Sequence, residues 1–161
     1  MSRIAAKLAS LGLVLPKAIQ PPPGVVLPFK PVRVLGLRAY VSGHGPLNPD
    51  GTLAPPFGKV GRDLSVEQGA RAARLTGLAM LGSIERELGD LDRVRAWTRV
   101  FGMVNSATGF NQQPRVMNGF SELILELFGP DRGAHSRSAV GMAELPFDLP
   151  VEIEAEIEID P

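Results

Sequence analysis

The nine residues from Val151 to Ile159, VEIEAEIEI, alternate strictly between apolar and acidic side chains. A period of two is typical of a β-strand whose two faces meet different surroundings. The apolar face must be buried by other elements, whereas carboxylates about 6.8 Å apart on the opposite face can stay in water. The sequence therefore predicts a sheet that helices cover on one side only, with Glu154 to Glu158 on the acidic side.

The other segments supply the helices and further strands. Ser65 and Gln68 form a capping box before a long helical segment that ends at Gly89, and a second helix is predicted from Gln113 to Phe128. Strands are predicted at 32–43, with a break at Gly36, and at 92–106, 136–145 and 151–159. This order of elements predicts an α+β fold in a single domain.

The N-terminal segment differs in composition from the rest of the chain. Residues 3–11 have the spacing of a short amphipathic helix, and six prolines follow between Pro16 and Pro31. Such a proline-rich segment can be neither a helix nor a central strand. We therefore divide the chain into an N-terminal helix and proline-rich arm at 1–28 and a domain at 29–161, with the arm lying over the domain or linking to it.

Arg137 stands one position before the apolar run of a predicted strand. A half-buried guanidinium keeps its charge and so needs an anion, which can be a fixed carboxylate of the protein or one that arrives with a ligand. The strands at 136–145 and 151–159 are joined only by PFDLP, which predicts a hairpin. In that hairpin Glu152 would lie close to Arg137, in a register that the sequence does not fix.

The composition argues against several functional classes. Lys plus Arg equal Asp plus Glu at 17 each, so the basic surplus typical of nucleic-acid binding is missing. The absence of cysteine excludes disulfides, thiolate nucleophiles and cysteine-type zinc sites. His44 and His135 are the only histidines and lie far apart in sequence, so we expect no metal and no cofactor. His135 is at least as plausible in a structural role as in a site.

No apolar stretch reaches the roughly 18 residues of a membrane span. The amphipathic start of the chain also lacks the features of a signal peptide. A soluble, cytoplasmic protein is therefore expected, with no membrane partner.

Five blocks in unbroken order, spanning about 29–156, carry a resemblance to a known family. They are GLRAYVSGHGP, GKVGRDLSVEQGARAAR, LGDLDRV, MNGFSELILELFG and HSRSAVGMAELPFDLPVEIEAE. The chain resembles the RidA (YjgF) family of reactive-intermediate imine and enamine deaminases, in one of its longer subgroups. The resemblance implies a chorismate-mutase-like fold, with a mixed sheet packed by two helices, and a homotrimer with ligand clefts between subunits. It also implies hydrolysis of small 2-imino and 2-enamino acids, such as 2-aminoacrylate, to 2-oxo acids and ammonia.

Matching positions imply a set of site residues. Arg137 corresponds to the arginine that binds the substrate carboxylate, and Asn118 to an asparagine of the second helix in the same cleft. Glu152 corresponds to the glutamate linked to water activation, and Ser42 to the serine of the SG motif; we take these two as the catalytic candidates. The other substrate-binding candidates are Phe29, His44 and Ala139.

Three of these positions depart from the family pattern. Phe29 stands where the best-known deaminases have tyrosine, so one hydroxyl is missing. His44 replaces the usual glutamine after SG. Ala139 occupies a position commonly filled by cysteine, which acts through a backbone carbonyl that alanine retains. These departures leave the reaction type in place and open the question of the substrate, because a phenyl ring and an imidazole could suit a larger imino acid.

The chemistry agrees with the residues present. An imine carbon is already electrophilic, so catalysis requires a positioned water, proton transfer and a clamp on the carboxylate, without a metal or a covalent nucleophile. One alternative is a non-catalytic trimer that binds or senses a carboxylate metabolite. A second is an endoribonuclease, which the balanced charge argues against. A serine hydrolase is disfavoured because VSGHG is not a G-x-S-x-G elbow.

Overall fold

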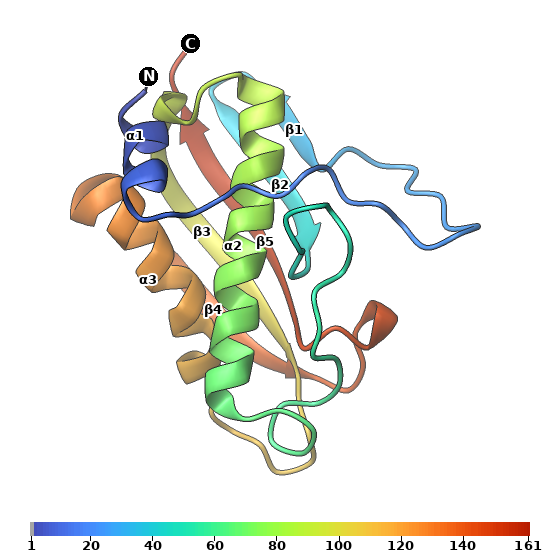
Figure 1. The fold of residues 1–161 in the computed structure, drawn as a ribbon. Helices are drawn as coiled ribbons and strands as arrows, with labels where there is room; N and C mark the ends of the chain where they lie inside the picture. The colour runs from blue at the N-terminus through green and yellow to red at the C-terminus, as the bar shows by residue number, and fades with distance from the viewer. Residues whose placement is uncertain (1) are drawn as a thin grey trace.

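The computed structural model describes residues 2–161 and shows one five-stranded sheet covered by helices on a single face (Figure 1). The α+β class predicted from the sequence is confirmed. The elements in chain order are α1 Arg3–Ser10, β1 Val32–Leu35, β2 Arg38–His44, α2 Val66–Leu88, β3 Val94–Asn105, α3 Gln113–Arg132, β4 Ser136–Met142 and β5 Val151–Ile159, with short 3₁₀ turns η1 Leu91–Arg93 and η2 Pro146–Asp148.

The strand order is β1-β2-β5-β3-β4, so β4 and β5 do not form the hairpin that the sequence predicted. β5 lies between β2 and β3 and is antiparallel to both, whereas β4 pairs with the outer edge of β3 in parallel. The helix α3 makes the crossover from β3 to β4 that parallel pairing requires. The eight residues from 143 to 150 then carry the chain past the end of β3. Arg137 and Glu152 are therefore separated by a strand.

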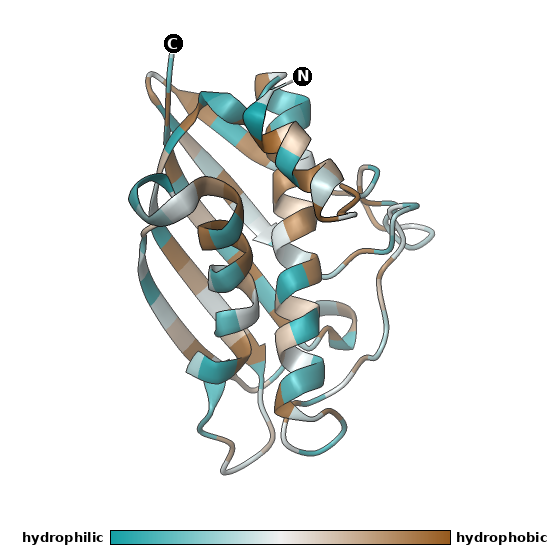
Figure 2. Cartoon of the chain, turned by 60° about the vertical axis from the view of Figure 1, so that its left-hand side comes forward, coloured by the Kyte–Doolittle hydropathy of each residue, from teal (hydrophilic) through white to brown (hydrophobic). Residues whose placement is uncertain are grey.

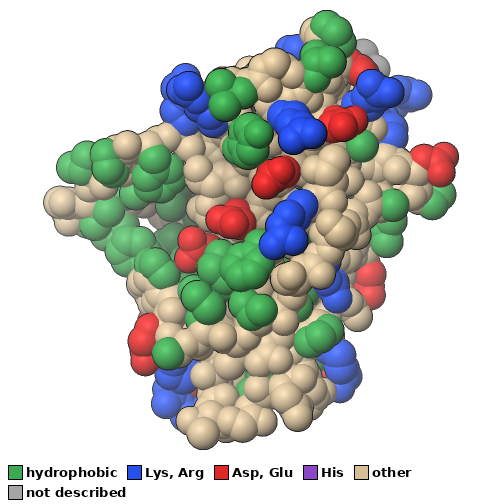
Figure 3. Space-filling view, turned by 180° about the vertical axis from the view of Figure 1, so that it is seen from behind, with side chains coloured by type: hydrophobic (Ala, Val, Ile, Leu, Met, Phe, Trp, Pro, Cys, Tyr) green, Lys and Arg blue, Asp and Glu red, His purple; other side chains and the backbone are tan. Residues whose placement is uncertain are grey.

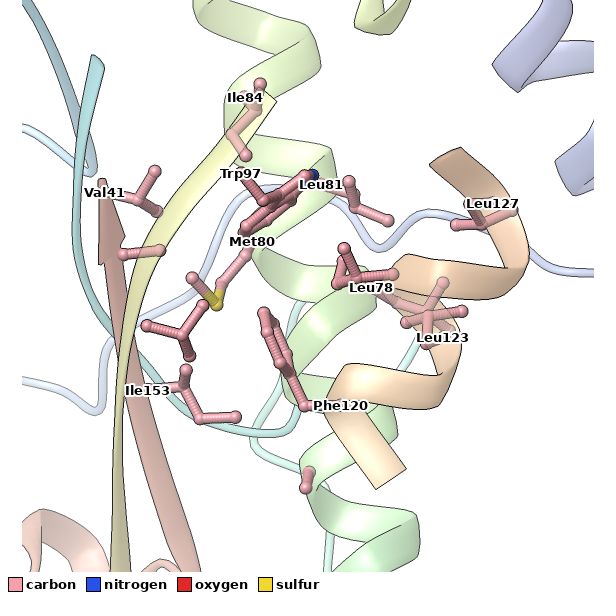
Figure 4. Close-up of a cluster of buried hydrophobic side chains, with 14 of the residues drawn as sticks. Val41, Leu78, Met80, Leu81, Ile84, Trp97, Phe120, Leu123, Leu127 and Ile153 are labelled. Atoms are coloured by element: carbon pink, nitrogen blue, oxygen red, sulfur yellow. The ribbon is translucent and has the colours of Figure 1, made fainter. Parts of the chain in front are cut away.

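The alternation in β5 gives the strand one buried face and one open face, as the sequence predicted. Its odd-numbered residues are buried beneath α2 and α3, and its glutamates lie on the opposite face. The strands in Figure 2 show the same alternation between hydrophobic and hydrophilic residues. Between sheet and helices, the ring of Trp97 meets those of Phe120 and Phe128 edge-on, with centroids 5.6 and 5.9 Å away (Figure 4). The face away from the helices carries charged side chains of both signs (Figure 3).

Both long helices begin and end for local chemical reasons. The capping box at Ser65 and Gln68 is formed in both directions, and Gly89 ends α2 in the left-handed conformation with φ 79°. In α3 the regular helix ends where the sequence predicted, because Gly129 has φ 78° and ψ 177°. The chain then makes one further turn that ends at Arg132.

The N-terminal segment lies against the domain before it projects from it. Ile4 and Leu8 of α1 are buried in the core. The amides of Lys17 and Gln20 donate to the carbonyls of Pro49 and Gly51, which fixes the start of the arm to a loop of the domain. The chain beyond this point loops out from the body of the molecule (Figure 1). Within residues 2–161, none of the helices has the length and apolarity needed to cross a membrane.

Candidate functional site

Arg137 lies on the edge strand β4 with its side chain against α3. Its Nη1 donates to Asn118 Oδ1 (3.1 Å) and to Ser121 Oγ (2.9 Å), and its Nη2 donates to the carbonyl of Pro114 (3.3 Å). Arg137 and Asn118, two of the predicted site residues, therefore lie side by side. We call Arg137, Asn118, Ser121 and His135 the Arg137 cluster.

His135 supports this arrangement from behind Ser121. Its Nδ1 donates to the carbonyl of Gly133 (2.7 Å), so its Nε2 is free to accept from the Ser121 hydroxyl (2.9 Å). Burial lowers the pKa of His135, and the charge of Arg137 lowers it further. A neutral His135 thus orients the Ser121 hydroxyl so that its oxygen accepts from Arg137. His135 therefore acts as a supporting residue, and Ser121 is a member of the cluster that sequence reasoning missed.

The Arg137 guanidinium has no carboxylate partner in the described part of the chain. Burial alone lowers its pKa, with no acidic group contributing. The three hydrogen bonds use three of its five N–H groups and leave Nε–H with one Nη2–H. Two such N–H groups can grip a carboxylate in a bidentate manner. The sequence allowed two sources for the anion that pairs with Arg137. Among residues 2–161 no carboxylate pairs with it, which leaves an anion that arrives with a ligand.

Glu152 lines a cavity of about 410 Å³ beside the end of β2. The arm, the C-terminal half of α2 and the loop around η2 form its other walls, and Phe29, Gly43 and His44 also line it. Hydrophobic side chains surround this hollow below the projecting arm in Figure 3. We call it the Glu152 cavity. The structure thus brings together three of the predicted site residues, Phe29, His44 and Glu152.

Burial raises the pKa of Glu152, and the nearby Glu154 carboxylate raises it further. No cation contributes to the shift, so the carboxylate has no charged partner that would hold it ionised. Gly43 lies directly against it: a Cβ at this position would overlap Glu152 Oε1 and lie 3.0 Å from its Cδ. The glycine of the SG motif therefore makes room for the Glu152 carboxyl group. A raised pKa in a cavity is typical of a group that takes and gives protons.

His44 is held in the cavity wall by a second arginine–serine–histidine chain. Its Nδ1 donates to the Ser42 carbonyl (2.6 Å), and its Nε2 accepts from the Ser83 hydroxyl (2.9 Å), whose oxygen accepts from Arg86 (3.0 Å). Burial lowers the pKa of His44, which keeps the imidazole neutral. Ser83 and Arg86 were not predicted, although a buried serine within an apolar helix face is a usable signal.

Ser42 and Ala139 lie outside both groups. The Ser42 hydroxyl donates to the Lys30 carbonyl (2.8 Å), and its amide donates to Pro31 (2.9 Å), so this serine joins the arm to β2. It borders a shallow hollow on the open sheet face that Glu154 also lines. Ala139 pairs with Gly102 and packs against the core. Neither residue reaches the Glu152 cavity within one chain.

The Arg137 cluster and the Glu152 cavity are separate places in one chain. Arg137 pairs with Val100, and Glu152 pairs with Met103 on the other edge of β3. Strand spacings of about 4.8 Å and an offset of three residues along β3 put their Cα atoms more than about 10 Å apart. Arg137 faces α3, whereas Glu152 belongs to the acidic face. Within one chain, therefore, the Arg137 guanidinium and the Glu152 carboxyl group do not meet.

Known proteins are similar to this chain in sequence and in fold. Residues 5–150 match the family model described as "YjgF/chorismate_mutase-like, putative endoribonuclease". The Trypanosoma cruzi protein TCP17 is 39% identical over 158 residues, which cover 98% of this chain and 95% of that one. The Agrobacterium tumefaciens protein Atu1372 is 38% identical, with a TM-score of 0.86 over 99% of this chain and 93% of that one.

A likeness at lower identity concerns the fold alone. The Escherichia coli protein TdcF, in a crystal structure with bound serine, has a TM-score of 0.58 and 21% identity, covering 89% of this chain and 99% of that one. The family match spans strands β1 to β4 and both long helices. The resemblance inferred from the sequence blocks is confirmed: the chain belongs to the YjgF/chorismate mutase-like (RidA) family.

Proposed function

We propose that the protein hydrolyses 2-imino and 2-enamino acids to 2-oxo acids and ammonia, in a cleft that two copies of the chain form together. The Arg137 cluster of one copy binds the substrate carboxylate, and the Glu152 cavity of its neighbour holds the reacting carbon. The observation that carries the proposal is that the Arg137 cluster and the Glu152 cavity lie apart within one chain. Among residues 2–161, Arg137 has an unused pair of N–H groups and no carboxylate partner, and no cation pairs with Glu152. A homotrimer, which the family resemblance implies, would repeat this cleft at each interface.

The reaction needs no group beyond these residues and water. Glu152 in its carboxylate form takes a proton from a water as the water oxygen bonds to the carbon of the protonated imine, whose nitrogen becomes an amine. The protonated Glu152 then gives the proton to that amine. The Glu152 carboxylate takes the proton of the new hydroxyl group as the C–N bond breaks, so ammonia leaves and the C=O bond of the 2-oxo acid forms. A carboxyl group with a raised pKa suits both steps, because it exchanges protons closer to neutral pH.

The comparisons support the kind of ligand at the level of the family. TdcF was crystallised with serine, an amino acid with the carboxylate that our proposal assigns to Arg137. The wording of the family model also includes endoribonuclease. For this chain the equal number of acidic and basic residues disfavours a nucleic-acid substrate.

A second candidate function is binding of a carboxylate metabolite without turnover. Phe29 favours it, because it lines the Glu152 cavity without the hydroxyl that tyrosine would contribute. The two functions are separated by mixing the protein with an amino-acid oxidase, its amino acid and semicarbazide. A deaminase removes the imine before semicarbazide traps it, so semicarbazone formation falls as protein is added. Unchanged semicarbazone formation, together with 2-oxo acid binding, would leave only the binding function.

The pH profile of turnover should respond to Glu154. Because Glu152 must be ionised to accept a proton from water, kcat/KM should rise with pH through the raised pKa of Glu152. The negative charge of Glu154 contributes to that raised pKa. Glu154→Gln should therefore move the rising limb to lower pH while the plateau changes little. Steady-state rates from pH 4 to 8 measure this, and Glu158→Gln, farther along the same face, is the matched control. A limb that stays in place would remove Glu152 as the titrating base.

A further inference from the structure

We infer that the Glu152 cavity selects a substrate with a large apolar side chain, so that the preferred 2-imino acid is branched aliphatic or aromatic rather than the three-carbon 2-aminoacrylate. This inference rests on the proposed function, because it names the substrate class of the same site. It goes against the small substrate that the family resemblance implies. The cavity volume of about 410 Å³ falls within the roughly 300–1,000 Å³ typical of small-molecule sites and leaves room for more than a methylene group.

The lining of the cavity is apolar over most of its extent. Val32, Leu47 and Leu149 are 2%, 5% and 5% exposed and form fixed parts of the wall. Phe29 and Phe147 are 54% and 45% exposed, so two aromatic rings stand at its accessible part. Exposed aromatic rings beside a hollow are unfavourable in water and gain free energy when an apolar group covers them.

The polar groups of the wall gather beside α2: His44 and Ser83 are engaged, whereas Arg86 uses only two of its five N–H groups and Glu87 is exposed. Both ring nitrogens of His44 are hydrogen-bonded, to the Ser42 carbonyl and to the Ser83 hydroxyl. The Ser83 oxygen also accepts from Arg86, whose other Nη donates to the Pro16 carbonyl (3.1 Å). Glu152 is reserved for the reaction. Against the apolar remainder of the wall, away from Arg86 and Glu87, a charged or hydroxylated side chain would lose hydration without gaining matched partners.

The arm supplies the wall that makes the cavity deep. Ile19 and Leu27 line the cavity and are half-buried, although they belong to the segment that projects from the domain. Val26, next to Leu27, is 81% exposed and does not line it. The arm is anchored near the cavity by the bonds of Lys17, Gln20 and Arg86. A shorter chain without this arm would leave the cavity more open.

The substrate series is tested with the full chain in the semicarbazide assay. Imines are generated by amino-acid oxidases from alanine, leucine and phenylalanine. Each buried methylene group contributes about four-fold to transition-state binding, and the leucine side chain has three more carbons than that of alanine. The kcat/KM for the leucine-derived imine should therefore exceed that for the alanine-derived one by up to about 60-fold. Binding of the matching 2-oxo acids, pyruvate and 4-methyl-2-oxopentanoate, is measured by calorimetry as a readout that needs no turnover.

Two tryptophan variants test whether the arm determines the preference for a large apolar side chain. Leu27→Trp should fill the cavity and lower kcat/KM for the leucine-derived imine at least ten-fold, with a smaller effect on the alanine-derived imine. Val26→Trp, at the adjacent exposed position, should leave both rates unchanged.

The outcomes distinguish a failure of the apolar pocket from a failure of the deaminase function. Turnover of all imines at similar rates, with equal binding of the two 2-oxo acids, would overturn the apolar pocket and leave the deaminase function standing. Absence of turnover, with tighter binding of 4-methyl-2-oxopentanoate, would overturn the deaminase function and support the pocket. Identical behaviour of the two tryptophan variants would overturn the role of the arm.

Discussion

Arg137→Ala should reduce kcat/KM for 2-imino acids on the order of 10²–10⁴-fold while the protein still folds. Two charge-assisted hydrogen bonds to the substrate carboxylate are lost, and each is worth about 1.5–3 kcal/mol. The side chain holds only neutral partners, Asn118, Ser121 and the Pro114 carbonyl, so its removal strands no buried charge. The stability loss should be about 1 kcal/mol, a few degrees in melting temperature.

Arg137→Lys separates charge from geometry. Lysine keeps the positive charge but cannot present two parallel N–H groups, so it should recover only a small part of the activity. Arg95→Ala, an exposed arginine on β3, is the control for a general change in surface charge. A large fall in melting temperature with unchanged affinity for a 2-oxo acid would show that Arg137 is structural.

Glu152→Gln should lower kcat on the order of 10²–10⁴-fold, because the amide cannot accept a proton from water. The variant fills nearly the same volume beside Gly43, so the shape of the cavity is kept. Semicarbazone assays give the rate, and calorimetry with a 2-oxo acid should show that binding is retained. Retained turnover would assign the proton transfer to another group.

The same variant should be at least as stable as the native protein at neutral pH. Burial raises the pKa of Glu152 in the folded chain above its unfolded value, so the ionised carboxylate lowers the stability of the fold. That cost is absent below the unfolded pKa, where both states are protonated, and grows until the pH passes the folded pKa. The melting temperatures of Glu152→Gln and native protein should therefore coincide near pH 3 and diverge toward pH 8. Glu158→Gln, on the same strand, is the control.

Local features of the fold could be predicted from the sequence because short-range chemistry determines them. The alternation from Val151 to Ile159 identified both a strand and its buried face, and Ser65, Gln68 and Gly89 identified the ends of a helix. The strand order could not be obtained in this way. A five-residue connection is compatible with a hairpin, and nothing local indicates that β3 lies between the two strands.

The candidate site was predictable only in part for the same reason. The family blocks identified Arg137, Asn118 and Glu152, but their placement on two sides of β3 depends on strand order. Ser121 and Ser83 were missed because each acts through a contact between a helix and a strand, and Arg86 because it acts through Ser83 and the arm. Ser42 lies on the expected strand, but its hydroxyl donates a hydrogen bond to the Lys30 carbonyl. Sequence alone therefore named candidate residues but not how they are arranged.

The claim that two copies of the chain complete one cleft is tested most directly by mixing inactive variants. Arg137→Ala and Glu152→Gln are each expected to have little activity as pure proteins, and equal amounts are unfolded and refolded together so that mixed oligomers form. A cleft is intact when a chain with native Arg137 meets a neighbour with native Glu152, which occurs for half times half, or about a quarter, of the clefts. Our proposal predicts recovery of about a quarter of native activity. If mass spectrometry shows mixed oligomers but no activity returns, both residues must act within one chain, and the shared cleft is contradicted.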